Sequence, residues 1–201
     1  MAFPRTEKKL YEKDRVDLAI DDFAKIEKPK KSDLNRVKVM AQIEQGIDKY
    51  RAAASKMSID ELEGEAHQST ILAHFMEVNG DIKPHSKCHA HAIVSGAHRY
   101  AAELRAILAW LKLRIDDPDN GCWLPENTAA KLHMPKHLQN AVPHSRIHRY
   151  NYYFWLNSLI DVVTTPTQQD LRRALNMVAA RLQSGSQPKY VMNKKGEGLP
   201  I

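Results

Sequence analysis

The sequence predicts a mainly α-helical protein with a small β component. Apolar residues recur at helical spacing along most of the 201 residues, as in the stretch AHRYAAELRAILAWLKLR. Two short segments are typical of strands instead, one around residues 89–94 and one after the turn-rich loop IDDPDN. Hydrophobic residues make up 43% of the chain and charged residues 27%, which is typical of a globular protein with one sizeable core.

Residues 1–80 are expected to be helical. A first helix covers TEKKLYEKDRVDLAIDDFAKIEK and ends before Pro29, and a second begins at a Ser32 cap. A third helix begins at Ser58, which has capping-box spacing to Glu61, and ends near Gly80. No chemically distinctive motif lies in this region, so we interpret it as a helical support or docking layer.

Residues 81–185 have a different character, because Gly and Pro separate short elements. The two strands flank the helix AHRYAAELRAILAWLKLR, and an irregular stretch follows over residues 128–143. We expect one helix to begin near His144 and a last helix to begin at a Thr167 cap. Residues 186–201 are polar, contain Gly and Pro, and are predicted to form a flexible tail.

Composition restricts the classes of function. The formal net charge of +6 is compatible with a polyanionic partner such as nucleic acid, although it does not single one out. No apolar run approaches the roughly 18–20 residues of a membrane span, and the N-terminus lacks the apolar core of a secretory signal peptide. Two cysteines, Cys88 and Cys122, exclude both a disulfide framework and a four-cysteine zinc site.

Histidine is concentrated in one part of the chain, since eight of the ten lie between residues 85 and 148. His144 and His148 are four residues apart where a helix is expected, so both imidazoles would lie on one face and could share a cation. The pair alone is as easily explained as two surface residues, but a third histidine group lies upstream in the extended run CHAHA. Three imidazoles with an open fourth position describe a catalytic metal site rather than a closed structural one.

The other histidines of this stretch need no function. His98 lies among basic residues at the start of a helix and is interpreted as a solvated side chain. His133 and His137 are also four residues apart, but Pro135 between them argues against a regular helix.

Two longer runs resemble the AHH nuclease family of the HNH/endonuclease VII superfamily. They are AHAIVSGAHRYAAELRAILAWLKLRIDDPDNGCWLPEN and PHSRIHRYNYYFWLNSLI. The family pattern is Ala-His-His-Ile-Val, a helix, an Asn-Gly loop before Leu-Pro, and His-Ser-x-x-His before a tyrosine-rich helix. Several separated motifs match in order over about residues 88–162. The resemblance implies a ββα-metal (treble-clef-like) nuclease core, which we assign to residues 81–185.

The resemblance also implies roles for individual residues. His91, His144 and His148 correspond to ligands of a divalent metal ion, either Mg²⁺ or Zn²⁺, with Mn²⁺ or Ni²⁺ as alternatives. Asn120 corresponds to the asparagine that braces the catalytic strand or orients the general base, and Gly121 would permit a tight turn beside it. An ordinary turn at these two residues is the simpler alternative.

Ala92 departs from the family pattern. The family has its second histidine here, the residue that takes a proton from water, and a methyl group cannot do so. The chain is either an engineered, disarmed variant or a naturally degenerate domain; we favour the first, because the three implied ligands are intact. His89 is a poor substitute base, since in an extended segment His89 and His91 point to one side and residue 92 to the other.

Three arginines flank the expected site and could contact substrate phosphate, or could equally be ordinary surface charges. They are Arg99, Arg146 and Arg149.

The resemblance implies a metal-dependent endonuclease toxin of bacterial competition that hydrolyses DNA, or alternatively RNA, and is blocked by a cognate immunity protein. Such a protein would be made in the bacterial cytoplasm and carried by a secretion system into the cytoplasm of a target cell. Residues 1–80 would then serve delivery or form part of the immunity interface. Two alternatives are a non-catalytic nucleic-acid- or protein-binding module with a structural metal, and a zinc hydrolase of small substrates, which the lack of an HExxH motif disfavours.

Overall fold

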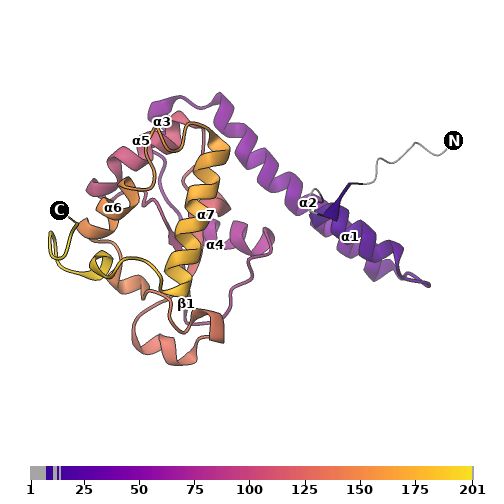
Figure 1. Cartoon of the computed structure of the whole chain (residues 1–201). Coiled ribbons are helices and arrows are strands. Elements are labelled where there is room, and N and C mark those ends of the chain that lie inside the picture. The colour runs from indigo at the N-terminus through magenta and orange to yellow at the C-terminus, as the bar shows by residue number, and fades with distance from the viewer. Residues whose placement is uncertain (1–7, 11–12, 14, 201) are drawn as a thin grey trace. The chain divides into compact units, whose positions relative to one another are not determined.

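Helices dominate the structure, as the sequence predicts (Figure 1). The computed structural model describes residues 8–10, 13 and 15–200, and these contain a single sheet of two strands. The chain forms two compact units, residues 1–50 and 51–201, which are described separately below. None of the described helices combines the length and the apolar character that crossing a membrane requires.

The first unit contains α1 (Arg15–Ala24) and most of α2 (Lys31–Ala53). Part of the first predicted helix, at residues 6, 7, 11, 12 and 14, lies outside the described residues. The second predicted helix begins at Lys31, two residues before the start that a Ser32 cap would give. The carboxylate of Asp33, rather than Ser32, accepts a hydrogen bond from the backbone amide of Lys30 at 2.8 Å.

The expected third helix is in fact two helices, α3 (Ile59–Glu63) and α4 (Ser69–Val78). The predicted capping box is present, with Ser58 and Glu61 each accepting the other's backbone amide. The helix is interrupted because the Asp116 carboxylate accepts the amide of Gln68 at 3.0 Å. Both helices belong to the unit 51–201, whereas the sequence analysis grouped them with residues 1–80.

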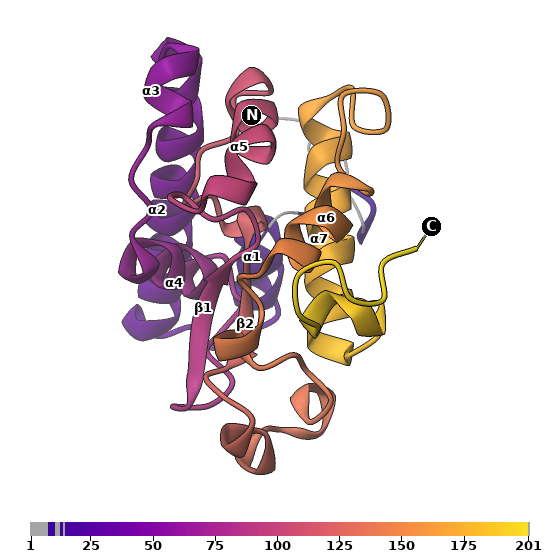
Figure 2. The same ribbon diagram turned by 90° about the vertical axis from the view of Figure 1, so that its left-hand side faces the viewer.

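The sheet pairs β1 (Cys88–Ala92) with β2 (Gly121–Pro125) in antiparallel register (Figure 2). His91 lies opposite Cys122 and Ala92 opposite Gly121. Residues directly opposite each other share a face of the sheet, so the side chains at 91 and 92 point to opposite faces.

Gly121 shows which face of the sheet packs against α4. A tight 3₁₀ turn, Pro118–Asn120, directly precedes Gly121, but Gly121 itself is extended, with φ −120° and ψ 153°, so the turn does not require a glycine. Glycine is needed for close packing instead: a Cβ at this position would lie 2.6 Å from Sδ of Met76 and 2.9 Å from Cδ1 of Leu72, both in α4. Ala92 therefore faces α4, and His91 faces the other side.

The remaining helices are α5 (Ala102–Trp110), α6 (Tyr150–Asn157) and α7 (Gln168–Ser184). The predicted Thr167 cap is confirmed, because its side chain accepts the backbone amide of Asp170, and α7 ends at Gly185 in the left-handed conformation, with φ +74°. Short 3₁₀ turns connect the elements, at Ala54–Lys56, Arg99–Ala101, Pro118–Asn120, Ala129–His133, Lys136–Leu138, His144–Arg146 and Lys189–Met192.

No α-helix begins near His144, which corrects the sequence prediction. His144 starts a 3₁₀ turn of three residues, and α6 begins six residues later, at Tyr150. The chain cannot continue as one helix, because Arg149 is extended, with φ −126° and ψ 165°.

Residues 186–200 pack against the rest of the second unit, where a flexible tail was expected. Val191 is fully buried in the core. The side-chain amide of Asn151 in α6 donates to the carbonyl oxygens of Tyr190 at 2.9 Å and Glu197 at 3.1 Å. Asn151 is itself fully buried, and the two protons of its side-chain amide are both used by these carbonyl oxygens.

A buried carboxylate fixes the loop that precedes β2. Asp117 is 1% exposed and accepts hydrogen bonds from Arg51 and from Arg172 of α7 at 2.9–3.1 Å. Burial opposes ionisation of Asp117, but the hydrogen bonds from the two arginines outweigh it and lower the pKa of the carboxyl. Asp119 joins the same cluster and is more exposed, at 19%.

We expect Asp117→Asn to lower the free energy of unfolding by about 2–4 kcal/mol, less than for a fully buried pair because both arginines are partly exposed. Asp119→Asn removes one carboxylate from the same cluster at a more exposed position and should cost less. Urea denaturation followed by circular dichroism measures both. Equal losses for the two variants would contradict a special role for the buried carboxylate.

Candidate metal centre

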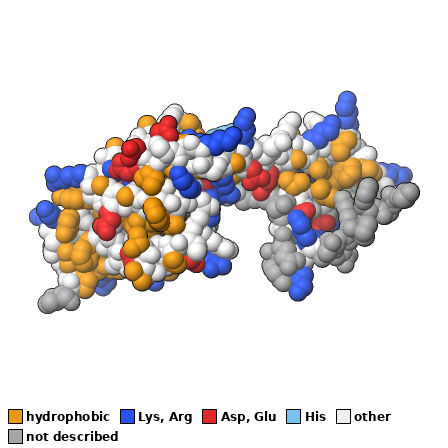
Figure 3. All heavy atoms as spheres, turned by 90° about the horizontal axis from the view of Figure 1, so that it is seen from above, with side chains coloured by type: hydrophobic (Ala, Val, Ile, Leu, Met, Phe, Trp, Pro, Cys, Tyr) orange, Lys and Arg blue, Asp and Glu red, His pale blue; other side chains and the backbone are white. Residues whose placement is uncertain are grey.

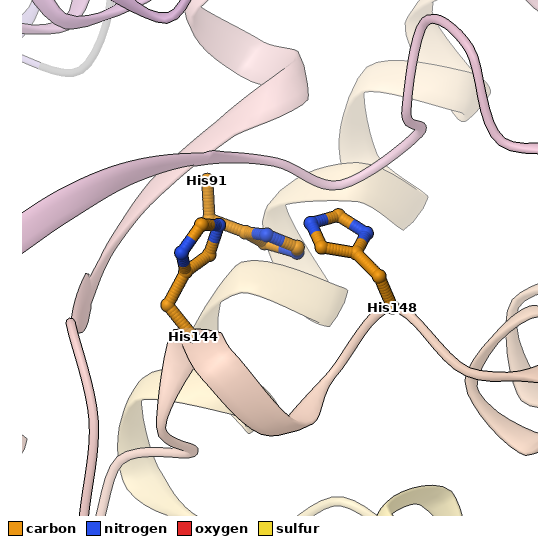
Figure 4. A group of neighbouring side chains, drawn as sticks. All are labelled: His91, His144 and His148. Carbon is orange, nitrogen blue, oxygen red and sulfur yellow. The ribbon is translucent and has the colours of Figure 1, made fainter.

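Three histidines from separate segments converge beside β1. His91 comes from β1, His144 from the 3₁₀ turn His144–Arg146, and His148 from the residues between that turn and α6. Figure 4 shows the imidazoles pointing toward one another, and one ring nitrogen from each lies within 4.8 Å of the others. Their ring centroids are 4.9–5.4 Å apart. The structure thus brings together the three residues named as ligands from the sequence.

The hydrogen bonds of His91 fix which of its nitrogens is free. Oη of Tyr152 lies 3.1 Å from Nε2 of His91 and donates to the carbonyl oxygen of Ile93 at 2.8 Å. A hydroxyl has one proton, so Nε2 must donate to Tyr152 and the neutral ring keeps its lone pair on Nδ1. That atom is fully buried and has no hydrogen-bond partner among the described residues. A metal ion is a natural partner for such an atom.

His148 is held by the next residue of α6. Oη of Tyr153 lies 3.0 Å from Nδ1 of His148, so the tautomer that donates to this tyrosine leaves Nε2 free for a metal. Burial raises the pKa of Tyr153 to about 12 and that of Tyr152 well above its usual range, so both phenols stay neutral near pH 7. Two adjacent tyrosines therefore orient two of the three imidazoles.

Burial also lowers the pKa of all three imidazoles. Desolvation is the largest cause for each, and the charges of neighbouring histidines add to it. The pKa of His148 falls to about 4, and that of His91 lies well below its usual value. The neutral imidazole is the form that binds a metal, so the centre is ready to accept one at neutral pH.

The donor set suits some of the expected ions better than others. Three neutral nitrogens with room for a further ligand are typical of catalytic Zn²⁺, and imidazole also suits Ni²⁺. Mg²⁺ prefers oxygen ligands in a near-ideal octahedron, so it fits this set least well. The residues present therefore fit a divalent transition-metal ion.

His89 and Ala92 lie on opposite faces of β1. The ring centroid of His89 is 5.4 Å from that of His144, and its Nε2 is 3.7 Å from a carboxylate oxygen of Glu126. The side chain of His89 is 52% exposed, so it lies at the rim of the centre. Ala92 is buried on the α4 face. The alternation expected from the sequence is what the structure shows.

Asn120 braces the segment that follows β1. It is fully buried, and its side-chain oxygen accepts the amide of Val94 at 2.9 Å. Its side-chain amide donates to the carbonyl oxygens of Val94 at 3.1 Å and of Ile115 at 2.8 Å. These contacts fix the path of the chain directly after His91 and Ala92, which is one of the two roles expected of this residue.

The three flanking arginines are all exposed. Arg99 donates to the hydroxyl of Tyr100 at 2.7 Å, and Arg149 donates to the carbonyl oxygen of Met192 at 3.2 Å. Arg146 lies in the turn between His144 and His148. Figure 3 shows Lys and Arg side chains at several separate places on the visible face, with hydrophobic side chains between them.

A further histidine, His67, interacts with this centre, and the sequence analysis did not identify it. Its Nδ1 lies 2.5 Å from a carboxylate oxygen of buried Asp116, and its charge contributes to the lowered pKa of all three clustered imidazoles. A Cβ at Gly96 would lie 2.6 Å from Cβ of His67, so His67 packs closely on the loop that follows β1. A carboxylate that orients a histidine is a common arrangement in active sites. No spacing rule links residues 67 and 116, and only the tyrosine-rich run hints at Tyr152 and Tyr153.

We expect the chain to bind one Zn²⁺ ion and Tyr152→Phe to weaken this binding by about 10- to 100-fold, because His91 loses the partner that sets its tautomer. Tyr150→Phe removes a hydroxyl from the same helix without touching the three histidines and is the control. Isothermal titration calorimetry in a chelator-buffered solution measures both affinities. If Tyr152→Phe binds zinc as tightly as the control, the tyrosine does not position His91.

Acid should destabilise the metal-free protein in a defined window. The three imidazoles have lower pKa values in the folded state, so the unfolded state binds more protons between about pH 4, the pKa of folded His148, and about pH 6.5. Unfolding free energy should therefore fall as pH drops through this window, and His148→Gln should reduce the slope. Urea denaturation in excess chelator tests this; equal slopes for the two proteins would contradict it.

Comparison with known proteins agrees with this geometry. Residues 72–183 match AHH, a nuclease family of the HNH/ENDO VII superfamily with conserved AHH. The match covers more than half of the 201 residues and includes all three clustered histidines. No curated protein and no solved structure matches the chain. The chain therefore belongs to the AHH family of nucleases within the HNH/ENDO VII superfamily.

Proposed function

We propose that this protein is a metal-dependent endonuclease toxin that hydrolyses phosphodiester bonds in DNA. Its nuclease family indicates nucleic acid as the substrate class. The observation that carries the metal dependence is the convergence of three neutral imidazoles, one of which has a buried nitrogen without a partner among the described residues. The net charge of +6 favours association with a polyanion.

Each side chain of the centre has a separable task in this proposal. His91, His144 and His148 hold the ion, and Tyr152 and Tyr153 fix the orientation of two of these rings. A divalent ion bound there supplies positive charge to the scissile phosphate and to its leaving oxygen. The exposed arginines Arg99, Arg146 and Arg149 attract the phosphate backbone without reading its sequence.

Position 92 determines how well the protein works as an enzyme. In the family pattern this position takes the proton from the attacking water, and alanine has no proton acceptor. We propose that Ala92 leaves the protein folded and able to bind metal but greatly reduced in activity. The structure supports the first part of this proposal: position 92 faces α4, on the side of β1 opposite His91, so alanine there does not disturb the contacts of His91 with Tyr152. For the same reason, a histidine at 92 would have to turn toward the metal centre to act as the base.

The biological setting follows from the family resemblance. We propose that the protein acts between competing bacteria, is made without a secretory signal peptide, and is delivered by a secretion system into the cytoplasm of a target cell. A cognate immunity protein would protect the producer. The helices of residues 1–80 would serve delivery or bind that immunity protein.

We expect Ala92→His to raise the rate of plasmid DNA cleavage by about 10²- to 10⁴-fold, the usual contribution of a general base. Cleavage should require added Zn²⁺, Ni²⁺ or Mn²⁺ and should stop with a chelator. His148→Ala in the Ala92→His background should abolish it, because one ligand is lost. Gel analysis of nicked and linear plasmid measures all three proteins, with an RNA substrate in parallel.

Zinc titration and thermal unfolding of Ala92→His serve as controls for folding. If that variant folds, binds metal and still cuts neither DNA nor RNA, the protein is a non-catalytic binding module with a structural metal. If the unaltered protein already cuts as fast, Ala92 is not disabling, and His67→Gln would test whether His67 takes the proton instead.

A further inference from the structure

We propose that an aromatic pocket next to the metal centre binds one unpaired nucleobase of the substrate. The pocket has a volume of about 320 Å³ and is lined by Tyr100, Tyr150, Tyr153, Phe154, Asn157 and Ser158. The inference rests on the nuclease function proposed above and adds to it a substrate class, namely nucleic acid that is single-stranded or locally unpaired.

One residue joins the pocket to the metal centre. Tyr153 lines the pocket, and its hydroxyl lies 3.0 Å from Nδ1 of His148. Its ring also stacks on His98, with centroids 4.7 Å apart. A base seated in the pocket would therefore keep its sugar and phosphate near the three histidines.

The walls of the pocket offer aromatic faces under positive charge. The rings of Tyr100 and Tyr150 meet edge to face, with centroids 5.1 Å apart, and both are only half-buried. Nζ of Lys195 lies 5.1 Å from the Tyr150 centroid and 5.9 Å from that of Tyr100, and the guanidinium of Arg99 lies 4.7 Å from the Tyr100 centroid. Bases stack on aromatic rings and cations hold the neighbouring phosphates, which is how proteins bind single strands.

Asn157 adds a polar side chain to the aromatic residues that line the pocket. The side-chain amide of Asn157 donates to a carboxylate oxygen of Glu103 at 3.1 Å, which fixes the orientation of the group. Its oxygen, Oδ1, is then buried without a hydrogen-bond partner among the described residues.

A pocket for a single base limits which forms of nucleic acid can bind. A base inside a duplex is stacked on both sides and cannot enter a pocket unless it is turned out of the helix. The pocket therefore selects single strands, or duplexes that open locally, over regular double helix.

Binding without cleavage tests this inference directly. The full chain is mixed, in excess chelator, with fluorescein-labelled single-stranded (dC)₈, with an abasic octamer that carries the same phosphates, and with duplex of the same length. Anisotropy should show (dC)₈ bound about 5- to 150-fold more tightly than the abasic strand, the range expected for stacking of one base. Duplex should bind no more tightly than the abasic strand.

The variants separate stacking from charge and from folding. Tyr150→Leu should lose the preference for (dC)₈ over the abasic strand while binding the abasic strand unchanged, and Tyr150→Phe should keep the preference. If Tyr150→Leu weakens both strands equally, or if duplex binds as tightly as (dC)₈, the pocket does not hold a base.

The outcome stays distinct from that of the nuclease proposal. If Ala92→His cleaves plasmid but the chain shows no preference for (dC)₈ over the abasic strand, the pocket proposal is wrong and the nuclease proposal stands. If the chain prefers (dC)₈ but Ala92→His cleaves neither DNA nor RNA, the nuclease proposal is wrong and the pocket still binds a base.

Discussion

The metal centre depends on the hydroxyl of Tyr152, which lies between His91 and the backbone of Ile93 at the end of β1. This hydroxyl donates a hydrogen bond to the carbonyl oxygen of Ile93 at 2.8 Å and accepts one from Nε2 of His91 at 3.1 Å. Tyr152, His91 and Ile93 are all fully buried, so water cannot replace either hydrogen bond if it is lost. The hydroxyl thereby ties α6 to the end of β1 and sets the tautomer of His91. Nδ1 of that histidine is consequently an acceptor, aimed into a cluster of two more imidazoles.

The charge state of the cluster follows from the same burial. Three rings with centroids 4.9–5.4 Å apart repel one another when protonated, and desolvation disfavours each charge further. The protein therefore keeps these side chains neutral at a pH where free histidine is partly charged. A bound cation would be a partner for Nδ1 of His91, which has none among the described residues, and protons would not compete with it at neutral pH.

Helix α6 links this centre to its surroundings. Tyr152 and Tyr153 each hold one histidine, and Tyr153 and Phe154 line the aromatic pocket. Consecutive residues of a helix point in directions about 100° apart, so one short segment can contact several neighbouring sites. Ala92 lies outside this set, because it faces α4. Alanine at position 92 therefore departs from the family pattern without disturbing the three histidines of the metal centre.

The sequence by itself determined the mainly helical class, the caps at Ser58 and Thr167, and the three clustered histidines, because these depend on local spacing and on ordered motifs. Tertiary structure alone decided that His144 begins a 3₁₀ turn, that Gly121 is glycine because α4 packs on it, and that the tail is packed. It also decided which tyrosines orient the ligands, since His91 and Tyr152 are 61 positions apart. Periodicity reports which face of an element is buried, whereas partners brought together by packing leave no trace in the spacing of residues.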